Sequence, residues 1–317
     1  MSVNGEGVPR DTAGAAPAGA PVDGTDGPVD LDALLATARR AAAAGAAVLA
    51  DAVAGGTDEW RMDATTKSSD SDWVTSYDLA AERAVRAVLS AERPDDVVSG
   101  EEFGTSGSDD AAVPTDGSGL RWSVDPLDGT TNFIRGIVYY ATSVAVIGAG
   151  GRWLAGVVNA PALGVEYSAA AGRGAWRRRL IGDAAQDRPR RLTGPDPERP
   201  GRLLATGFSY NGSSRTRQFN ELEGLMSAFA DVRRLGSAAL DLCLVADGTL
   251  DAFRESGLHE HDWAAGALIA QEAGCWVHRS TASTALADPA GQWREEGITA
   301  ATSRHEARRL DLDLDLE

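Results

Sequence analysis

The segment 125–133 constrains the fold and the chemistry of this chain more than any other. The apolar residues Leu120, Trp122 and Val124 lead into Asp125, and Asp128 follows three residues later, directly before a Gly-Thr-Thr turn. This pattern predicts a buried strand that ends in two carboxylates and passes through a glycine turn into a helix. Carboxylates can hold a hard divalent cation, and the open N–H groups of such a turn can hold phosphate. Together they indicate phosphoryl chemistry.

The composition fits a globular protein and limits its partners. The chain has 317 residues, of which 43% are hydrophobic and 24% charged, so it can bury the core of one large domain or two ordinary ones. A net charge of −17 argues against nucleic acid as the main partner, because phosphate backbones require basic patches. The same charge disfavours an anionic substrate unless cations mask the local acids. We therefore expect a small phosphate ester bound through metal ions.

Cysteine usage and hydropathy predict a cytoplasmic enzyme. Cys243 and Cys275 both lie in apolar surroundings, which favours buried free thiols in a reducing compartment, with one disulfide as the alternative. The N-terminal residues lack the basic segment and apolar core of a secretory signal. No apolar run is expected to be long enough to span a bilayer, so we expect no membrane partner.

The N-terminal half, residues 29–185, is predicted to be an α+β domain. Residues 1–28 lack apolar periodicity and are expected to be a disordered tail. Asp30 has the position of a helix N-cap, and apolar residues continue at helical spacing to Leu49. The other expected elements are a helix over 77–91, a strand over 97–100, a mobile loop over 104–119, and a meander of strands over 139–147, 153–158 and 164–169.

The C-terminal half, residues 195–308, is predicted to be an α/β domain. The Pro- and Arg-rich stretch 182–201 is the expected boundary. Beyond it, strands and helices alternate, which favours an α/β arrangement. The expected elements are strands over 203–206 and 250–253 and helices over 218–229, 238–246 and 262–273, the last closed by Gly274. Residues 311–316 alternate Asp with Leu, Glu317 follows them, and the segment 309–317 is expected to be a solvated acidic tail.

Acids at the ends of other predicted elements can join Asp125 and Asp128. Glu101 and Glu102 follow a strand, and Asp78 and Asp262 stand at helix starts, where each alone would be an ordinary cap or surface charge. Strand ends in α/β folds converge on ligand crevices. Carboxylate oxygens suit Mg²⁺, and clustered acids repel one another without a cation. The set therefore predicts a magnesium site.

These motifs, occurring together and in this order, resemble the inositol monophosphatase family of Mg²⁺-dependent, lithium-sensitive phosphatases, in particular its SuhB-like bacterial members. The resemblance covers about residues 30–305 and rests on the segments 67–69, 74–78, 100–102, 125–133, 234–246 and 262–266. It implies a fold of the α+β / α/β class, namely the five-layered αβαβα sandwich of the inositol monophosphatase and fructose-1,6-bisphosphatase type. It also implies a homodimer.

The resemblance further implies roles for individual residues. Two or three Mg²⁺ ions would be held by five groups: Glu101, Asp125, the carbonyl of Leu127, Asp128 and Asp262. The catalytic residues would be Glu101, Asp78 and Thr130, the last two orienting the attacking water. The substrate would be contacted by Gly129, Thr130, Gly236, Ser237, Ala238, Glu255 and His259. The chain departs from the family at His261, which precedes Asp262 where the family usually has Trp; this changes the wall beside the substrate.

The expected function is hydrolysis of inositol 1-phosphate by metal-activated water attacking in line, without a covalent phospho-enzyme. Histidinol phosphate and fructose 1,6-bisphosphate are the alternative substrates, and Glu255 favours the inositol ester. An aspartyl-nucleophile phosphatase would need its two acids two residues apart, whereas Asp125 and Asp128 are three apart. An alternative of another class is a non-catalytic protein of RNA-complex assembly, which would need a basic surface; the candidate runs are 177–179 and 188–191.

Overall fold

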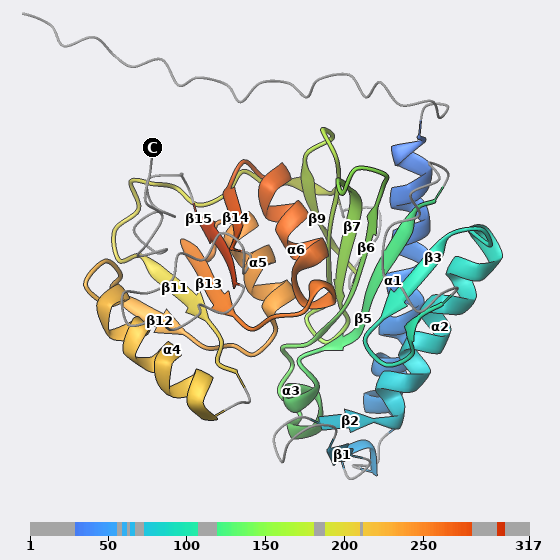
Figure 1. The fold of residues 1–317 in the computed structure, drawn as a ribbon, viewed down its shortest axis with the longest axis horizontal. Helices are drawn as coiled ribbons and strands as arrows, with labels where there is room; N and C mark the ends of the chain where they lie inside the picture. The colour runs from blue at the N-terminus through green and yellow to red at the C-terminus, as the bar shows by residue number, and fades with distance from the viewer. Residues whose placement is uncertain are drawn as a thin grey trace, which may run out of the picture.

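The computed structural model describes residues 29–55, 59–61, 64–66, 73–106, 119–180, 188–209, 212–280 and 297–301. These residues form alternating layers of helices, sheet, helices, sheet and helix, which Figure 1 shows from right to left. The predicted five-layered sandwich is therefore confirmed. The expectations for residues 1–28, 67–69 and 309–317, and for most of the loop 104–119, lie outside the described residues.

In the described part of the chain, eight strands form the first sheet, in the order β10-β9-β8-β7-β6-β5-β3-β4. They are β3 (Val97–Gly100), β4 (Gly104–Thr105), β5 (Arg121–Asp128), β6 (Ala141–Ile147), β7 (Trp153–Ala160), β8 (Val165–Ala170), β9 (Ala175–Arg179) and β10 (Arg190–Arg191). The antiparallel run from β5 to β9 is the predicted meander extended at both ends. β4 corrects the predicted loop, because its two residues pair with β3.

The pairing of β3 with β5 positions the site. The two strands are parallel, and Gly100 lies opposite Val124. Their carboxyl ends therefore reach the same edge of the sheet, so that the next residues, Glu101 and Asp125, emerge beside one another. A separate two-stranded sheet, β1 (Ala64–Thr66) with β2 (Trp73–Thr75), leads into the second helix.

Two long helices, α1 (Leu31–Ala54) and α2 (Ser76–Glu92), form the outer layer on the first sheet (Figure 1). As predicted, Asp30 caps α1, because its carboxylate accepts the N–H groups of Asp32 and Ala33 at 3.1 and 3.0 Å. α2 begins with a capping box between Thr75 and Asp78. Both predicted N-terminal helices are therefore present.

We expected no apolar run long enough to span a membrane, but α1 meets the length and composition criteria for a candidate span. α1 has 24 residues, and its hydropathy over an 18-residue window is 1.3, which meets the criteria for a candidate span. Alanine supplies most of this hydropathy. The apolar side of α1 packs against α2 and the first sheet, where Ala38, Ala42 and Leu49 are fully buried. A core helix of this kind passes the same test.

The middle layer consists of α5 (Ala238–Ala246) and α6 (Glu260–Glu272), which lie between the two sheets (Figure 1). Glycines bring α6 close to its neighbours. A Cβ on Gly156 of β7 would lie 3.0 Å from the Cα of Ala265, and a Cβ on Gly266 would lie 2.8 Å from the Cβ of Leu242 on α5. This contact fixes the start of α6, which carries Asp262. Gly274, with φ of +91°, follows α6 as predicted.

The core of this layer crosses the expected domain boundary. One cluster of buried apolar side chains joins residues of β6 to β8 with residues of α5, α6 and β15. Cys243 and Cys275 belong to it and are free thiols, as the sequence favours. Burial raises the pKa of both thiols. The division at residues 182–201 stays a prediction.

The second sheet has the order β12-β11-β13-β15-β14 among the described strands. They are β11 (Leu203–Thr206), β12 (Asp231–Arg233), β13 (Ala252–Ser256), β14 (Trp276–Ser280) and β15 (Gly297–Ala301). β11 is parallel to β12 and β13, whereas β15 runs antiparallel between β13 and β14. The strand predicted over 250–253 lies further along the chain, as β13. Its end was missed because the last residues of β13 are polar and show no apolar pattern.

One helix, α4 (Gly212–Leu225), covers the outer face of the second sheet (Figure 1). Leu225 and Phe229 bury their side chains there with Leu204 and Ala252. The predicted helix therefore exists, but its predicted bounds, 218–229, lie too far along the chain at both ends. Its first turns are polar and give no apolar period, and the residues after Leu225 form a turn whose apolar side chains still face the sheet.

Candidate active site

A cavity of about 580 Å³ lies where the ends of β3, β5, β11 and β13 meet the starts of α3 (Thr130–Arg135), α5 and α6. Every site residue predicted from the sequence lines it except Asp78. The structure thus brings together side chains that are up to 161 positions apart, from Glu101 to Asp262. The roles expected for these residues stay predictions.

Four acids converge at one side of the cavity. Asp125 and Asp128 have only 1% and 8% of their surface exposed. Burial, followed by the charges of Glu101, Asp128 and Asp262, raises the pKa of Asp125 well above its usual value. Burial also raises the pKa of Asp128 to about 7, and the charge of Asp262 adds to this effect while a hydrogen bond from Ser237 opposes it. The acids are therefore close enough to repel, and a divalent cation would relieve that repulsion.

Asp128 is held by the start of α5. The Ser237 hydroxyl donates to Asp128 Oδ2 at 2.6 Å, and the Ala239 N–H donates to the same oxygen at 2.7 Å. Asp125 Oδ1 accepts the Leu127 N–H at 3.0 Å, which fixes the turn between the two acids. These oxygen donors fit Mg²⁺, which prefers carboxylate and carbonyl ligands. The carboxylates are thus oriented before any cation binds.

The turn after β5 requires glycine. Gly129 has φ of +97°, and a Cβ there would lie 3.0 Å from the Tyr139 carbonyl and 3.2 Å from the Gly236 carbonyl. This turn opens α3, whose first residue, Thr130, lines the cavity. No side chain caps the start of α3 within the described residues. Its N–H groups are thus suited to hydrogen-bonding an anion.

Asp78 lies behind the cavity wall. It is fully buried in the capping box of α2, and its Oδ1 lies 3.0 Å from the Thr130 hydroxyl oxygen. The same hydroxyl lies 3.0 Å from the Leu127 carbonyl oxygen. Burial raises the pKa of Asp78 to about 6, although hydrogen bonds from Thr75 oppose the shift. Asp78 is therefore linked to the cavity through the Thr130 hydroxyl.

The opposite wall comes from β11, β13 and the segment before α5. Glu255 is packed against Gly207 so closely that a Cβ on that glycine would lie 2.1 Å from Glu255 Oε1. Burial raises the pKa of Glu255 well above its usual value. Arg234 is the one Arg or Lys among the described residues that line the cavity, and its charge lowers the pKa of Glu255 against the larger effect of burial.

Arg234, Trp73 and Phe208 line the cavity, although none of them was predicted as a site residue. Arg234 is the first residue of the segment 234–246 that carries the resemblance, and this position was the available signal. Trp73 directly precedes the segment 74–78 of the resemblance, and this position was the available signal. Phe208 comes from a part of the chain without a site motif, and nothing in its local sequence marks it.

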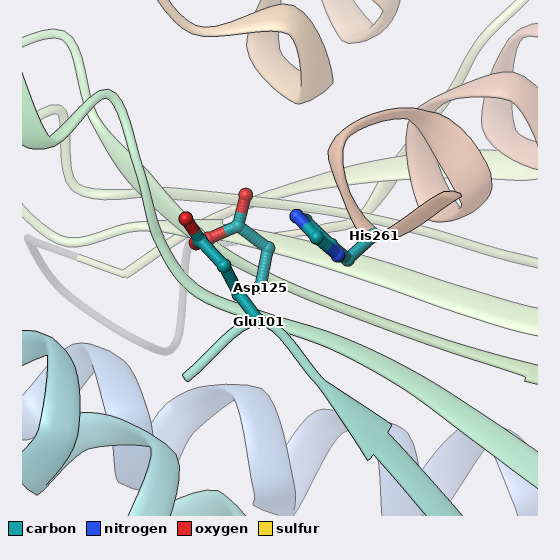
Figure 2. Close-up of side chains that lie close together, drawn as sticks. All are labelled: Glu101, Asp125 and His261. Carbon is teal, nitrogen blue, oxygen red and sulfur yellow. The ribbon is translucent and has the colours of Figure 1, made fainter. Parts of the chain in front are cut away.

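His261 was treated as a change in the substrate wall, but the structure places it beside the acids. One donor atom each of Glu101, Asp125 and His261 lies within 4.8 Å of the others. Figure 2 shows the two carboxylates next to each other, with the edge of the imidazole ring facing them from the start of α6. Among the described residues this is a candidate metal-binding group with a nitrogen donor.

Comparison with known proteins agrees with this geometry. The sequence profile described as "Inositol monophosphatase family" matches residues 30–311. The chain belongs to the inositol monophosphatase family. It is 45% identical to the inositol-1-monophosphatase SuhB of Mycobacterium tuberculosis over 215 residues, which are 68% of this chain and 71% of that protein. It is 40% identical to a protein of Pseudomonas aeruginosa named Nus factor SuhB over 220 residues, or 67% of this chain and 74% of that one.

Solved structures of the inositol monophosphatase family have the same fold. The structure of Mycobacterium tuberculosis SuhB superposes with a TM-score of 0.68 at 33% identity, covering 92% of this chain and all (100%) of that one. An inositol monophosphatase from Anabaena superposes with a TM-score of 0.66 at 27% identity, covering 90% and 97%. The resemblance stated from the motifs is therefore confirmed.

The buried acids predict a stability that depends on pH and on metal. The pKa of Asp128 is about 7 in the folded chain and lower when unfolded, so the folded state binds more protons between these values. Without divalent cations, the melting temperature should fall as pH rises from about 5 to about 7.5. Mg²⁺ binds the ionised acids, so its stabilising effect should be larger at the higher pH. Differential scanning fluorimetry with EDTA or MgCl₂, at matched ionic strength, measures both effects. Equal stabilisation at both pH values would contradict this prediction.

Proposed function

We propose that this chain is a Mg²⁺-dependent phosphate monoesterase that prefers inositol 1-phosphate, and that it works in the cytoplasm as a homodimer. The observation that carries the proposal is the convergence of Glu101, Asp125, Asp128 and Asp262 at the edge of a cavity large enough for a sugar-sized ester. Membership of the family supports phosphatase activity. The name of the Mycobacterium tuberculosis relative supports the choice of ester.

The acids and the Leu127 carbonyl would hold the magnesium ions. When bound, magnesium neutralises charge on the phosphate and the leaving oxygen and lowers the pKa of a coordinated water. The chain's own groups position the reactants. The N–H groups of Gly129 and Thr130 would hold phosphate oxygens at the start of α3. The Thr130 hydroxyl, placed by Asp78, would orient the attacking water.

The wall opposite the acids would select the alcohol. Glu255 and the start of α5 offer polar groups to several hydroxyls at once, which suits a polyol. A Glu255 carboxyl with a raised pKa can donate a hydrogen bond as well as accept one. Gly236, Ser237, Ala238 and His259 would contact the same part of the substrate.

The test is a panel of esters offered to purified protein with Mg²⁺. We expect the highest kcat/KM for inositol 1-phosphate and lower values for histidinol phosphate and fructose 1,6-bisphosphate. Phosphate release should stop when EDTA removes the metal. A clear preference for histidinol phosphate or fructose 1,6-bisphosphate would reassign the substrate. Failure to hydrolyse any member of the panel would overturn the proposal.

A non-catalytic role in assembling an RNA complex is the second candidate. Relatives from Pseudomonas aeruginosa and Pasteurella multocida are named Nus factor SuhB. The structure also pairs the two basic runs named above, because Arg177 on β9 lies opposite Arg190 on β10 at the edge of the first sheet. Part of this charge is neutralised internally, since Arg178 forms an ion pair with Glu166 at 3.0 Å. An RNA gel shift at physiological salt tests it; specific binding by a chain without phosphatase activity would favour this candidate.

A further inference from the structure

We propose that His261 donates an imidazole nitrogen to the cation held by Glu101 and Asp125. The site would then bind Mn²⁺, Co²⁺ or Zn²⁺ more tightly, relative to Mg²⁺, than an oxygen-only site does. The inference rests on the proposed function, because it concerns the same metal position. It specifies which side chain completes that position and which cations it favours.

The geometry brings three donors from three elements to one point. Glu101 follows β3, Asp125 lies on the parallel strand β5, and His261 is the second residue of α6. One donor atom of each lies within 4.8 Å of the others. Donors that share a cation at bond lengths of about 2.1 Å are about 3 to 4 Å apart. Shifts of under about 1 Å in the side chains would therefore let all three bind one ion.

The position of His261 is set by its surroundings. At the start of α6 the His259 N–H donates to Asp262 Oδ2 at 2.6 Å, which closes the capping box. Arg121 Nη2 donates to Glu260 Oε2 at 3.0 Å and ties the same turn to β5. The imidazole of His261 stacks on that of His259, with 5.5 Å between ring centroids, and only 19% of its side-chain surface is exposed.

The neighbouring carboxylate, Asp262, lies close to the ring as well. His261 Nε2 lies 3.6 Å from Asp262 Oδ1, which is longer than a hydrogen bond between these atoms. The ring also faces the pair Glu101 and Asp125 (Figure 2), and one of its nitrogens lies within 4.8 Å of an oxygen of each. An imidazole placed among three carboxylates has the chemistry of a metal ligand.

The chemical type of the donor atoms determines which cations bind more tightly. Mg²⁺ prefers oxygen ligands, whereas an imidazole nitrogen raises the affinity of a site for transition-metal ions. The gain is smallest for Mn²⁺, which also accepts oxygen ligands, and larger for Co²⁺ and Zn²⁺. The affinity ratio of Mn²⁺ to Mg²⁺ should therefore fall when the nitrogen is removed. Residues that tune a metal site change its affinity by about 10- to 100-fold, and we expect about tenfold here.

The experiment adds Mn²⁺ alone to metal-depleted protein and records pulsed EPR spectra, in which a bound imidazole gives ¹⁴N modulation. Calorimetry gives the Kd of Mn²⁺ and of Mg²⁺. Wild type should show the modulation, and His261→Gln and His261→Trp should lose it together with about tenfold of the Mn²⁺ preference. The control is His278→Gln on β14, outside the cavity lining, which should retain the modulation.

A complementary variant keeps the test decisive if the His261 variants do not fold. The chain has 4 histidines, so replacing His259, His278 and His305 by Gln leaves His261 alone. The modulation should persist in that variant. Its absence there or in wild type, or its persistence without His261, would overturn the inference, while Mg²⁺-dependent hydrolysis would still support the proposed function. Wild-type protein that binds neither cation would overturn both.

Discussion

Asp128→Asn is expected to lower kcat for phosphate ester hydrolysis by about 10³-fold while the fold survives. The variant removes the negative charge that the proposed cation needs but keeps an oxygen that can accept the hydrogen bonds from Ser237 and Ala239. Because burial makes the charge of Asp128 costly, the metal-free variant should be as stable as the original chain or more so. Stopped-time phosphate assays and melting curves with and without Mg²⁺ measure these effects.

Asp241→Asn provides the matched control for Asp128→Asn. Asp241 is a buried acid on α5, outside the cavity lining, that accepts the Tyr139 hydroxyl at 2.8 Å. The Asp241→Asn variant also loses one buried carboxylate, but that carboxylate is outside the proposed metal position. The kcat of this variant should therefore remain near that of the unmodified chain. If Asp128→Asn kept nearly full Mg²⁺-dependent activity, the metal assignment would be wrong.

Gly266→Val is expected to destabilise the chain by about 3 kcal/mol or more. The added Cβ would lie 2.8 Å from the Cβ of Leu242 and 2.9 Å from the carbonyl oxygen of Ala239, and neither atom is the end of a flexible side chain. α6 would have to move away from α5, and Asp262 would move with it. Urea unfolding gives the free energy, and the Mg²⁺-induced rise in melting temperature shows whether the site is still formed.

The control for Gly266→Val replaces Gly212 on α4 by Val. Among the described residues, a Cβ at Gly212 would meet no atom within 4 Å beyond its chain neighbours and its own helix backbone, so this substitution should be nearly neutral. Both changes replace a helical glycine by valine. The difference between their effects on the free energy of unfolding therefore reports the packing of α6 on α5. A Gly266→Val chain as stable as the Gly212→Val chain would show that the two helices can separate freely.

Elements with a clear local pattern could be predicted from the sequence. Asp30 and the apolar period after it identified the start of α1, and the apolar residues of β11 gave its bounds as 203–206. α4 was misplaced because its first turns carry no apolar side chain at helical spacing. The two-residue strand β4 is too short for any pattern, and it exists only through its pairing with β3.

The site was predictable where its residues share one motif. Asp125 and Asp128 lie on the same strand end, so local sequence joins them. Glu101 reaches Asp125 through the parallel pairing of β3 with β5, and a pairing between strands so far apart in sequence leaves no local pattern. The resemblance to the family supplied that connection. It gave no role to His261, because the family usually has a different residue there.

The place of β15 in the second sheet has a consequence for synthesis of the protein. β15 separates β13 from β14, and its Ile298 lies opposite Glu255, which faces the cavity. While residues 297–301 remain inside the ribosome, β13 and β14 have no strand between them, and this half of the substrate wall lacks its backing. We therefore expect nascent chains to gain the proposed phosphatase activity only after these residues have emerged, even though the acids proposed to bind metal are translated earlier.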